Sequence, residues 1–249
     1  MPKTLTHFFL IYLLIFPITL MAKQVLRIGV GNFPPFFIEK ENKGIFIEIT
    51  NEIFKQLPEY SVQYIFMSNN RLLHEINSGK RIDAACNIFQ DSKVNAYLSV
   101  PIFRYSDVAI SKKSSQLVVN KISDLQGKSI AAYQGAKELL GSEFKEMAIK
   151  NPQYSEHPHP KDTTYLMLSD SKDIRVGDIN IFWHDLNNKH YKEYAKADVS
   201  QFKIHSLWPD VYTHIAFKDP TLKDSVNKVI TELKRNGKIK EIYARHQLK

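Results

Sequence analysis

The stretch QVLRIGVGNFPPFF, residues 24–37, determines how the fold begins. Its first half alternates and is rich in branched apolar residues, which is typical of a β-strand. Pro34 and Pro35 then remove backbone donors, so the strand must give way to a loop. Apolar residues recur at helical spacing from Ile45 to Leu57, and Pro58 ends that helix. The sequence therefore predicts a strand that leads through a proline-containing loop into an amphipathic helix.

The same alternation of elements continues outward from this stretch. Residues 61–67 and 81–88 have the composition of strands, and a short helix over 71–78 lies between them. A strand–helix–strand–helix–strand order is typical of an α/β layered unit with a largely parallel sheet. A second pattern starts at the strand 129–133 and leads into a helix over 137–150. The chain is therefore expected to be α/β with two units.

The remaining elements complete both units. They are expected to be strands at 108–111, 179–183 and 211–217 and a helical region at 222–246 that breaks at Gly237, with less clear patterns at 163–167 and 174–178. We expect the first unit to span 23–110 and to take back 209–249, and the second to span 111–208. Two units joined by two crossings form a cleft, and ligand sites favour such clefts.

The N-terminal residues have the features of a secretory signal peptide. Lys3 gives a positive start, Phe8 to Leu20 is almost entirely apolar, and a cleavage point follows Ala22. An uncleaved membrane anchor is the alternative, but the apolar run is too short for a stable span and contains Pro17. We therefore expect residues 1–22 to be removed and the rest to be exported to the periplasm as a soluble monomer.

Composition excludes several classes of function. The 249-residue chain carries a formal charge of +8, but its lysines are scattered rather than gathered in a block, so they indicate a solvated surface and not a nucleic-acid patch. The single cysteine, Cys86, cannot form an intramolecular disulfide. It lies in an apolar run, which favours core packing over the alternative of a reactive nucleophile.

Seven segments in this order resemble the bacterial extracellular solute-binding proteins of family 3, the amino-acid-binding type. They are LRIGVGNFPPFF (26–37), GIFIEI (44–49), INSGKRIDAA (76–85), LSVP (98–101), ISDLQGKSIAAYQG (122–135), VGDINIFWHD (176–185) and DSVNKVITELKRNGKIKEIY (224–243). The resemblance covers essentially the whole exported chain. It implies the two-lobed type II periplasmic-binding-protein fold, in which each lobe is a mixed, mostly parallel sheet flanked by helices and the lobes close around a ligand.

The resemblance also implies aromatic walls and charged anchors for that ligand. Phe33 and Phe36 flank the double proline, where the family packs rings against the ligand, and core packing is the alternative for both. The family holds the ligand carboxylate with an Arg six residues before the aromatic of an FSxP motif. Here Ser92 stands at that position, with Lys93 beside it. Arg71 is a possible substitute and a solvated helix Arg is its alternative, so the ligand's charge stays open.

Two further ligand positions follow from the resemblance. Gln134 and Gly135 lie where a strand ends and a helix begins, and exposed backbone N–H groups at such a junction favour an anion. The family grips the ligand carboxylate there, and a purely structural turn is the alternative. Asp185 is matched with the carboxylate that pairs with the ligand's ammonium group, and a helix N-cap is the alternative.

Metal or cofactor chemistry is not expected. The segment His157-Pro158-His159-Pro160 offers two histidines, but a closed zinc site needs four ligands, and no second cysteine or HxxxH spacing is present.

The function predicted from the sequence is capture of a small polar ligand, an amino acid or a related compound, for an ABC importer in the membrane. The protein would then not be an enzyme. Two alternatives remain open on the same fold. One is a ligand-binding partner of a membrane sensor, and the other is a small exported dehydratase-like enzyme, for which Glu48 and Asp185 are unremarkable candidates.

Overall fold

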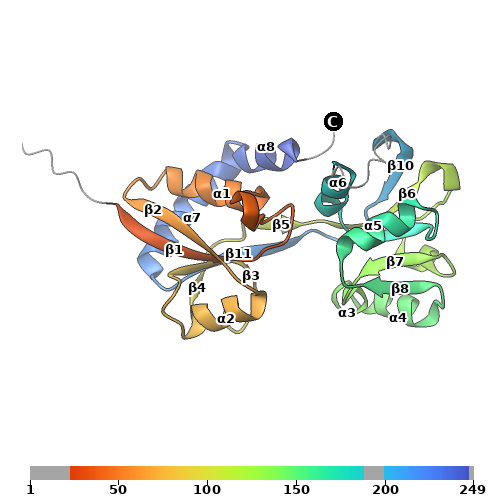
Figure 1. The fold of residues 1–249 in the computed structure, drawn as a ribbon, viewed down its shortest axis with the longest axis horizontal. Helices are drawn as coiled ribbons and strands as arrows, with labels where there is room; N and C mark the ends of the chain where they lie inside the picture. Colours follow the sequence, from red (N-terminus) through yellow and green to blue (C-terminus); the bar gives the residue numbers. More distant parts are fainter. Residues whose placement is uncertain (1–22, 188–198, 247–249) are drawn as a thin grey trace, which may run out of the picture.

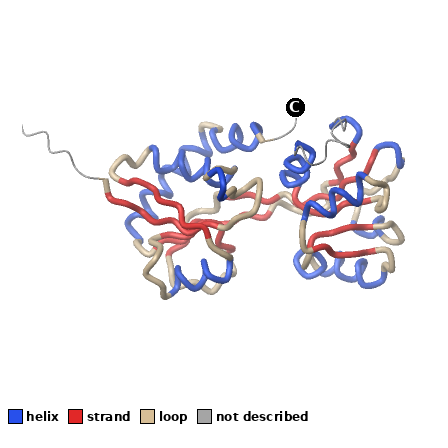
Figure 2. The backbone as a smooth tube through the Cα atoms, in the orientation of Figure 1, coloured by secondary structure: helices blue, strands red, loops and turns tan. Residues whose placement is uncertain are grey.

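The computed structural model describes residues 23–187 and 199–246, which form two lobes side by side (Figure 1). None of the helices in these ranges is both long and apolar enough to cross a membrane. The predicted signal peptide, residues 1–22, lies outside the described residues. Each lobe has a sheet with helices on both faces (Figure 2).

The first lobe contains a sheet in the order β2-β1-β3-β11-β4, with β5 also paired to β11. Its strands are β1 (Gln24–Val30), β2 (Tyr60–Phe66), β3 (Ala84–Phe89), β4 (Tyr97–Leu98), β5 (Phe103–Tyr105) and β11 (Val211–Phe217). β1 pairs in parallel with β2 and β3, whereas β11 is antiparallel to its neighbours. The chain therefore returns to the first lobe to insert β11 inside its sheet.

Helices cover both faces of this sheet. They are α1 (Ile45–Lys55), α2 (Asn69–Asn77), α7 (Pro220–Arg235) and α8 (Lys238–Arg245), with the short 3-10 turn η1 (Glu39–Glu41) before α1. α1, α7 and α8 pack over one face and α2 over the other. The predicted C-terminal helices are confirmed, and Gly237 separates them with a φ of 79°.

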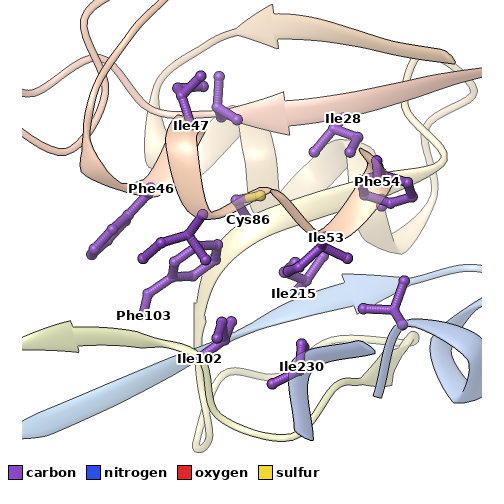
Figure 3. Close-up of a cluster of buried hydrophobic side chains, with 14 of the residues drawn as sticks. Ile28, Phe46, Ile47, Ile53, Phe54, Cys86, Ile102, Phe103, Ile215 and Ile230 are labelled. Atoms are coloured by element: carbon purple, nitrogen blue, oxygen red, sulfur yellow. The ribbon is translucent and has the colours of Figure 1, made fainter. Parts of the chain in front are cut away.

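The first core surrounds Cys86, whose side chain is fully buried among the residues labelled in Figure 3. Phe46 from α1 stacks on Phe103 of β5, with ring centroids 4.5 Å apart. The hydroxyl of Thr50 lies 3.7 Å from Sγ of Cys86. Burial raises the pKa of the Cys86 thiol to about 12. The predicted core role of this cysteine is confirmed.

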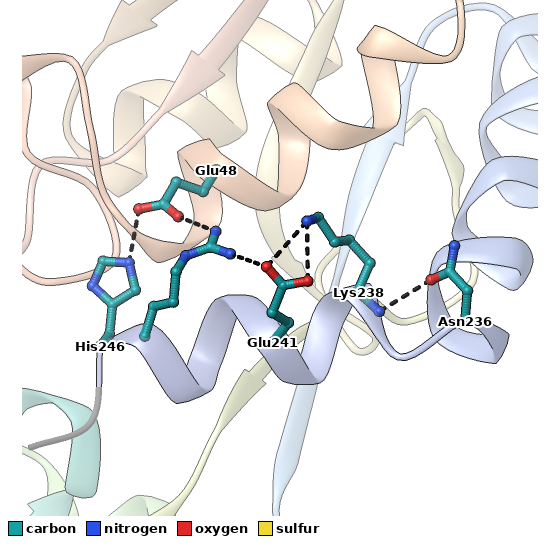
Figure 4. Close-up of polar contacts among 6 residues, drawn as sticks. Glu48, Asn236, Lys238, Glu241 and His246 are labelled. Atoms are coloured by element: carbon teal, nitrogen blue, oxygen red, sulfur yellow. Dashed lines mark hydrogen bonds and ion pairs between the residues drawn. The ribbon is translucent and has the colours of Figure 1, made fainter. Parts of the chain in front are cut away.

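Helix α8 is fastened to α1 by charged groups at the surface (Figure 4). The carboxylate of Glu48 accepts hydrogen bonds from Arg245 and His246, each at 2.8 Å. Arg245 also donates to Glu241, which in turn pairs with Lys238. The network joins the start of the first lobe to the end of the described chain.

The second lobe has a sheet in the order β10-β6-β9-β7-β8. Its strands are β6 (Asp107–Lys112), β7 (Ile130–Tyr133), β8 (Tyr154–His157), β9 (Ile174–Asp178) and β10 (Phe202–His205). Its helices are α3 (Ala136–Leu139), α4 (Ser142–Lys150), α5 (Pro160–Leu168) and α6 (Ile179–Asn187), with 3-10 turns η2 (Lys113–Ser115), η3 (Ile122–Leu125) and η5 (Val199–Gln201). α4 packs on one face, and α5 and α6 pack on the other.

Two of the predicted elements in this lobe are wrong. The predicted strand 179–183 is part of helix α6, because Ile179, Phe182, Trp183 and Leu186 recur at helical spacing and turn one face toward the core. The single helix predicted over 137–150 is broken into α3 and α4 at Gly141, whose φ of 92° ends the first turn.

The lobes are joined where β5 leads into β6 and where β10 leads into β11. All of β6 pairs within the second sheet, so the first crossing lies at Ser106, before residue 110. The Ser106 hydroxyl donates to Asp210 at 2.5 Å, which ties the two crossing segments together. Arg104 lies near the same carboxylate at 3.7 Å. The hinge therefore consists of two connecting segments between strands, which are linked by side chains.

Candidate functional site

A cavity of about 380 Å³ lies at the hinge and takes residues from both lobes. The first lobe contributes Phe89, Tyr105 and Val211. The second lobe contributes the polar groups of Asp107, Tyr133, Arg175 and Asp178 together with Leu139, Leu140, Pro160, Gly177 and Ile181. An apolar cavity with a few convergent charged groups between two units is the usual form of a small-molecule site.

Asp178 lies where β9 ends and α6 begins. Its Oδ1 accepts hydrogen bonds from the backbone N–H groups of Asn180 and Ile181 and from the Asn180 side chain, and its Oδ2 accepts from the N–H of Ser106. Burial raises the pKa of Asp178, and these donors act against that rise. The carboxylate therefore links the start of α6 to the hinge.

Asp107 faces Asp178 across the β6–β9 pair, in which the two residues are directly opposite. The Tyr133 hydroxyl donates to Oδ2 of Asp107 at 3.2 Å. Its Oδ1 makes no hydrogen bond with the residues that the structure describes. Burial, and then the charge of Asp178, raises the pKa of Asp107 to about 6. A second carboxylate therefore offers an open oxygen in the cavity.

Arg175 projects from β9 and is 1% exposed. Its Nε donates to Oγ1 of Thr164 at 3.1 Å, and its Nη1 donates to the backbone carbonyl of Asp178 at 3.2 Å. The same Thr164 hydroxyl donates to Oδ2 of Asp185 at 2.6 Å. A Cβ at Gly177 would lie 3.3 Å from Cδ1 of Tyr133 and 3.4 Å from Nη2 of Arg175, so both side chains pack close to this glycine.

Aromatic rings form much of the remaining wall. Phe89 and Tyr105 are nearly parallel, with centroids 6.3 Å apart and an interplanar angle of 8°. The Tyr105 hydroxyl donates to Asn87 at 2.9 Å, which fixes the ring. Phe89 is 47% exposed although it is large and apolar, so a ligand in the cavity would cover it.

The structure does not place the predicted aromatic residues in the cavity lining. Phe36 is fully buried in the first core, where its ring meets Phe46 and Tyr105 at 4.5 and 4.9 Å. Phe33 packs against Phe36 and Phe37. Phe36 therefore supports the back of Tyr105, which does line the cavity.

The predicted cations are also elsewhere. Arg71 is exposed on α2 and lies 3.5 Å from Glu75. Lys93 is exposed in the loop before β4, and its backbone carbonyl accepts a hydrogen bond from Asn77. Arg175 is the cation that the structure brings to the cavity among the described residues.

The junction at Gln134 and Gly135 has an internal partner. Gln134 is exposed, whereas the N–H groups of Gly135 and Lys137 donate to the two carboxylate oxygens of Glu156, each at 2.9 Å. The Tyr154 hydroxyl donates to the same carboxylate at 2.8 Å. The amide groups expected to face a ligand are therefore bonded to a side chain of β8.

Asp185 lies in the second turn of α6 and is 5% exposed. It is bonded to Thr164 and is not among the residues that line the cavity.

The two histidines of the segment 157–160 lie in different elements. His157 is at the end of β8 near Ser155, and His159 precedes α5. Within 23–187 and 199–246, no three His, Cys, Asp or Glu side chains gather in an arrangement that could hold a metal.

The sequence reasoning missed Asp107, Asp178 and Arg175. A signal for Asp178 was present, since the helical spacing of the apolar residues after it places it at the end of a strand and before a helix, the position of a capping carboxylate. The charge of Arg175 makes the segment of β9 look polar in the sequence, so it does not resemble a buried strand. No local pattern marks Asp107, because its role depends on the pairing of β6 with β9.

Comparisons with known proteins identify a family and two distant relatives. The model of the bacterial extracellular solute-binding proteins, family 3, matches residues 26–249. The probable amino-acid-binding protein YxeM of Bacillus subtilis (strain 168) is 23% identical over 236 residues, covering 88% of this chain and 82% of YxeM. The L-cystine-binding protein TcyJ of the same organism is 26% identical over 231 residues, with the same shares.

A likeness among solved structures extends the agreement to the fold. The ancestral cationic amino acid solute-binding protein AncCDT-1 has a TM-score of 0.72 at 18% identity, covering 90% of this chain and 96% of that one. The predicted two-lobed type II fold, with two mixed sheets flanked by helices, is confirmed.

Proposed function

The chain belongs to the bacterial extracellular solute-binding proteins of family 3, and on that premise we propose that it captures a small polar ligand, an amino acid or a related compound, between its lobes. The hinge cavity carries the proposal, because it takes residues from both lobes and holds an open carboxylate oxygen on Asp107. Rotation about the two hinge segments would bring Phe89 and Tyr133 together over a ligand.

We propose that the protein is a receptor and not an enzyme. Asp178 is engaged by backbone donors and Arg175 by Thr164 and a carbonyl, so these groups are fixed in position. Groups that are fixed before binding favour affinity, because little conformational entropy is lost when the ligand binds. We assign delivery to the membrane component of an ABC importer, with the protein acting as a monomer in the periplasm after removal of residues 1–22.

A panel of amino acids, amines, small peptides, organic acids and sugars tests the proposal by thermal unfolding of the purified protein. A ligand that binds only the folded state, at 100 times its Kd, adds about 2.7 kcal/mol. Each kcal/mol raises the Tm of a chain of this size by about 2–4 °C.

Small-angle scattering with the best compound should then show a more compact particle, as lobe closure requires. A panel in which no compound raises the Tm would contradict the proposal. A ligand that raises the Tm without compaction would contradict closure.

A further inference from the structure

The cavity carries an excess of negative charge. Asp107 and Asp178 line it together with one cation, Arg175, among the described residues. Arg175 is joined through Thr164 to a third carboxylate, that of Asp185, which is buried behind it. The guanidinium therefore has a further carboxylate within the lobe, and the charge of this one cation is shared among Asp185, Asp178 and Asp107.

The amide groups of the junction between β7 and α3 are closed to an anion. In the sequence, Gly135 and Lys137 lie between Tyr133 and Leu139, which both line the cavity. Its N–H groups are taken by both oxygens of Glu156. Burial acts to raise the pKa of Glu156, but the donors from Lys137, Gly135 and Tyr154 outweigh it and hold that pKa below its ordinary value. An incoming carboxylate would have to displace a group that is already charged.

The rest of the wall suits a cation. Phe89, Tyr105 and Tyr133 line the cavity, and aromatic rings can attract ammonium and guanidinium groups. The open Oδ1 of Asp107 can accept a hydrogen bond from such a group. Positive charge is therefore matched at two kinds of group. A carboxylate meets one guanidinium, whose Nε and Nη1 are already bonded, and an amide pair that Glu156 occupies.

We infer that the cleft selects small organic cations that lack a carboxylate, such as primary amines and guanidines, and that Glu156 excludes the corresponding amino acids. The inference rests on the proposed function and specifies its ligand class.

Matched pairs of compounds test it: arginine with agmatine, lysine with cadaverine, and tyrosine with tyramine. Each pair differs by one carboxylate, and titration calorimetry on the purified protein gives both Kd values. We expect at least one amine to bind at least about tenfold more tightly than its amino acid. If the amino acids bind as tightly as the amines, the inference is overturned while the proposed function stands. If neither series binds, it is also overturned, and the wider panel decides the proposed function.

Two variants separate the role of Glu156 from general charge effects. Glu156→Ala frees the amides of Gly135 and Lys137, so affinity for the amino acid should rise by about tenfold while that for the amine, which also reports correct folding, changes by less than about threefold. Glu143→Ala removes an exposed carboxylate from α4 of the same lobe and should change neither. An unchanged ratio in Glu156→Ala would overturn the role given to Glu156.

Discussion

Arg175 and Asp185 are joined through a single hydroxyl, that of Thr164, which accepts from the guanidinium at 3.1 Å and donates to the carboxylate at 2.6 Å. Both charged groups are almost fully buried. Burial raises the pKa of Asp185, while Thr164 and the charge of Arg175 act against that rise. The arrangement indicates that Asp185 balances a charge inside the second lobe.

Replacing Asp185 by Ala should therefore reduce stability rather than ligand affinity. Removing one partner of a buried charged pair costs about 3–5 kcal/mol, because the other charge is left without compensation. Urea unfolding measures the loss, and a titration at low temperature measures the Kd of the protein that remains folded. A large loss of affinity with unchanged stability would instead support the ligand contact expected from the sequence.

Asp107→Asn should remove a pH dependence of cation binding. The folded-state pKa of Asp107 is about 6, above its ordinary value of 3.8. Protons then compete with a bound cation below about pH 6, and affinity should fall by up to about tenfold per pH unit. Titrations between pH 5 and pH 8 measure this, with Glu143→Ala as the control. A wild-type Kd that is constant over this range would contradict the role of Asp107.

The same raised pKa has a consequence for the ligand-free protein. Asp107 ionises more readily in the unfolded chain than in the folded protein. Its ionisation therefore lowers the free energy of unfolding, with the full effect above about pH 6, and this effect disappears as the pH falls toward 3.8. Asp107→Asn should therefore raise the Tm more at pH 7 than at pH 4. Equal gains at both values would be inconsistent with the buried position of the carboxylate.

Cys86 should resist thiol reagents in the folded protein. Its side chain is fully buried and its pKa is about 12, so the thiolate that reacts is scarce at neutral pH. Labelling with iodoacetamide should be slower in buffer than in 6 M guanidinium chloride by roughly a hundredfold or more, since it requires opening of the first core. Comparable rates in both solvents would contradict the packing shown in Figure 3.

Glu48→Gln should weaken the contact between α1 and α8 at neutral pH by less than about 1 kcal/mol, because the pair is partly exposed and screened by water. Burial acts to raise the pKa of Glu48, but the hydrogen bonds from Arg245 and His246 outweigh it and lower that pKa. The ionised carboxylate therefore stabilises the fold at pH values above 4.5, which is its pKa in the unfolded chain. This contribution is lost as the pH falls through the lower pKa of the folded state. The difference in Tm between wild type and variant should shrink from pH 6 to pH 3, and a constant difference would exclude this account.

Much of the fold could be predicted from local patterns. The strand 24–30, the helix beginning at Ile45 and the C-terminal helices carry apolar periodicity that their packing confirms. The prediction for residues 174–187 failed for two reasons. Arg175 places a charge within an apolar strand, and the branched residues after this strand belong to a helix. The sequence alone could not show that the charge of Arg175 is buried, because its partners Thr164 and Asp185 lie in other elements.

The site was less predictable than the fold, for a physical reason. Asp107 and Asp178 meet only through the pairing of two strands, and Glu156 reaches Gly135 only because β8 lies beside β7. A sequence pattern can mark a strand-to-helix junction as a source of free N–H groups. It cannot show that a side chain 21 residues away has already bonded to them.

The insertion of β11 between β3 and β4 sets an order for folding. The second lobe is continuous in sequence, from β6 to β10, and these two strands are paired with Ile110 opposite Ile204. Once that lobe has formed, its two ends are held together, and Val211 of β11 lies opposite Tyr105 of β5 although more than 100 residues separate them in sequence. The entropy of closing that long loop has then already been lost, so completion of the first sheet becomes in effect a local step. The lobe that begins the chain is therefore expected to finish folding last.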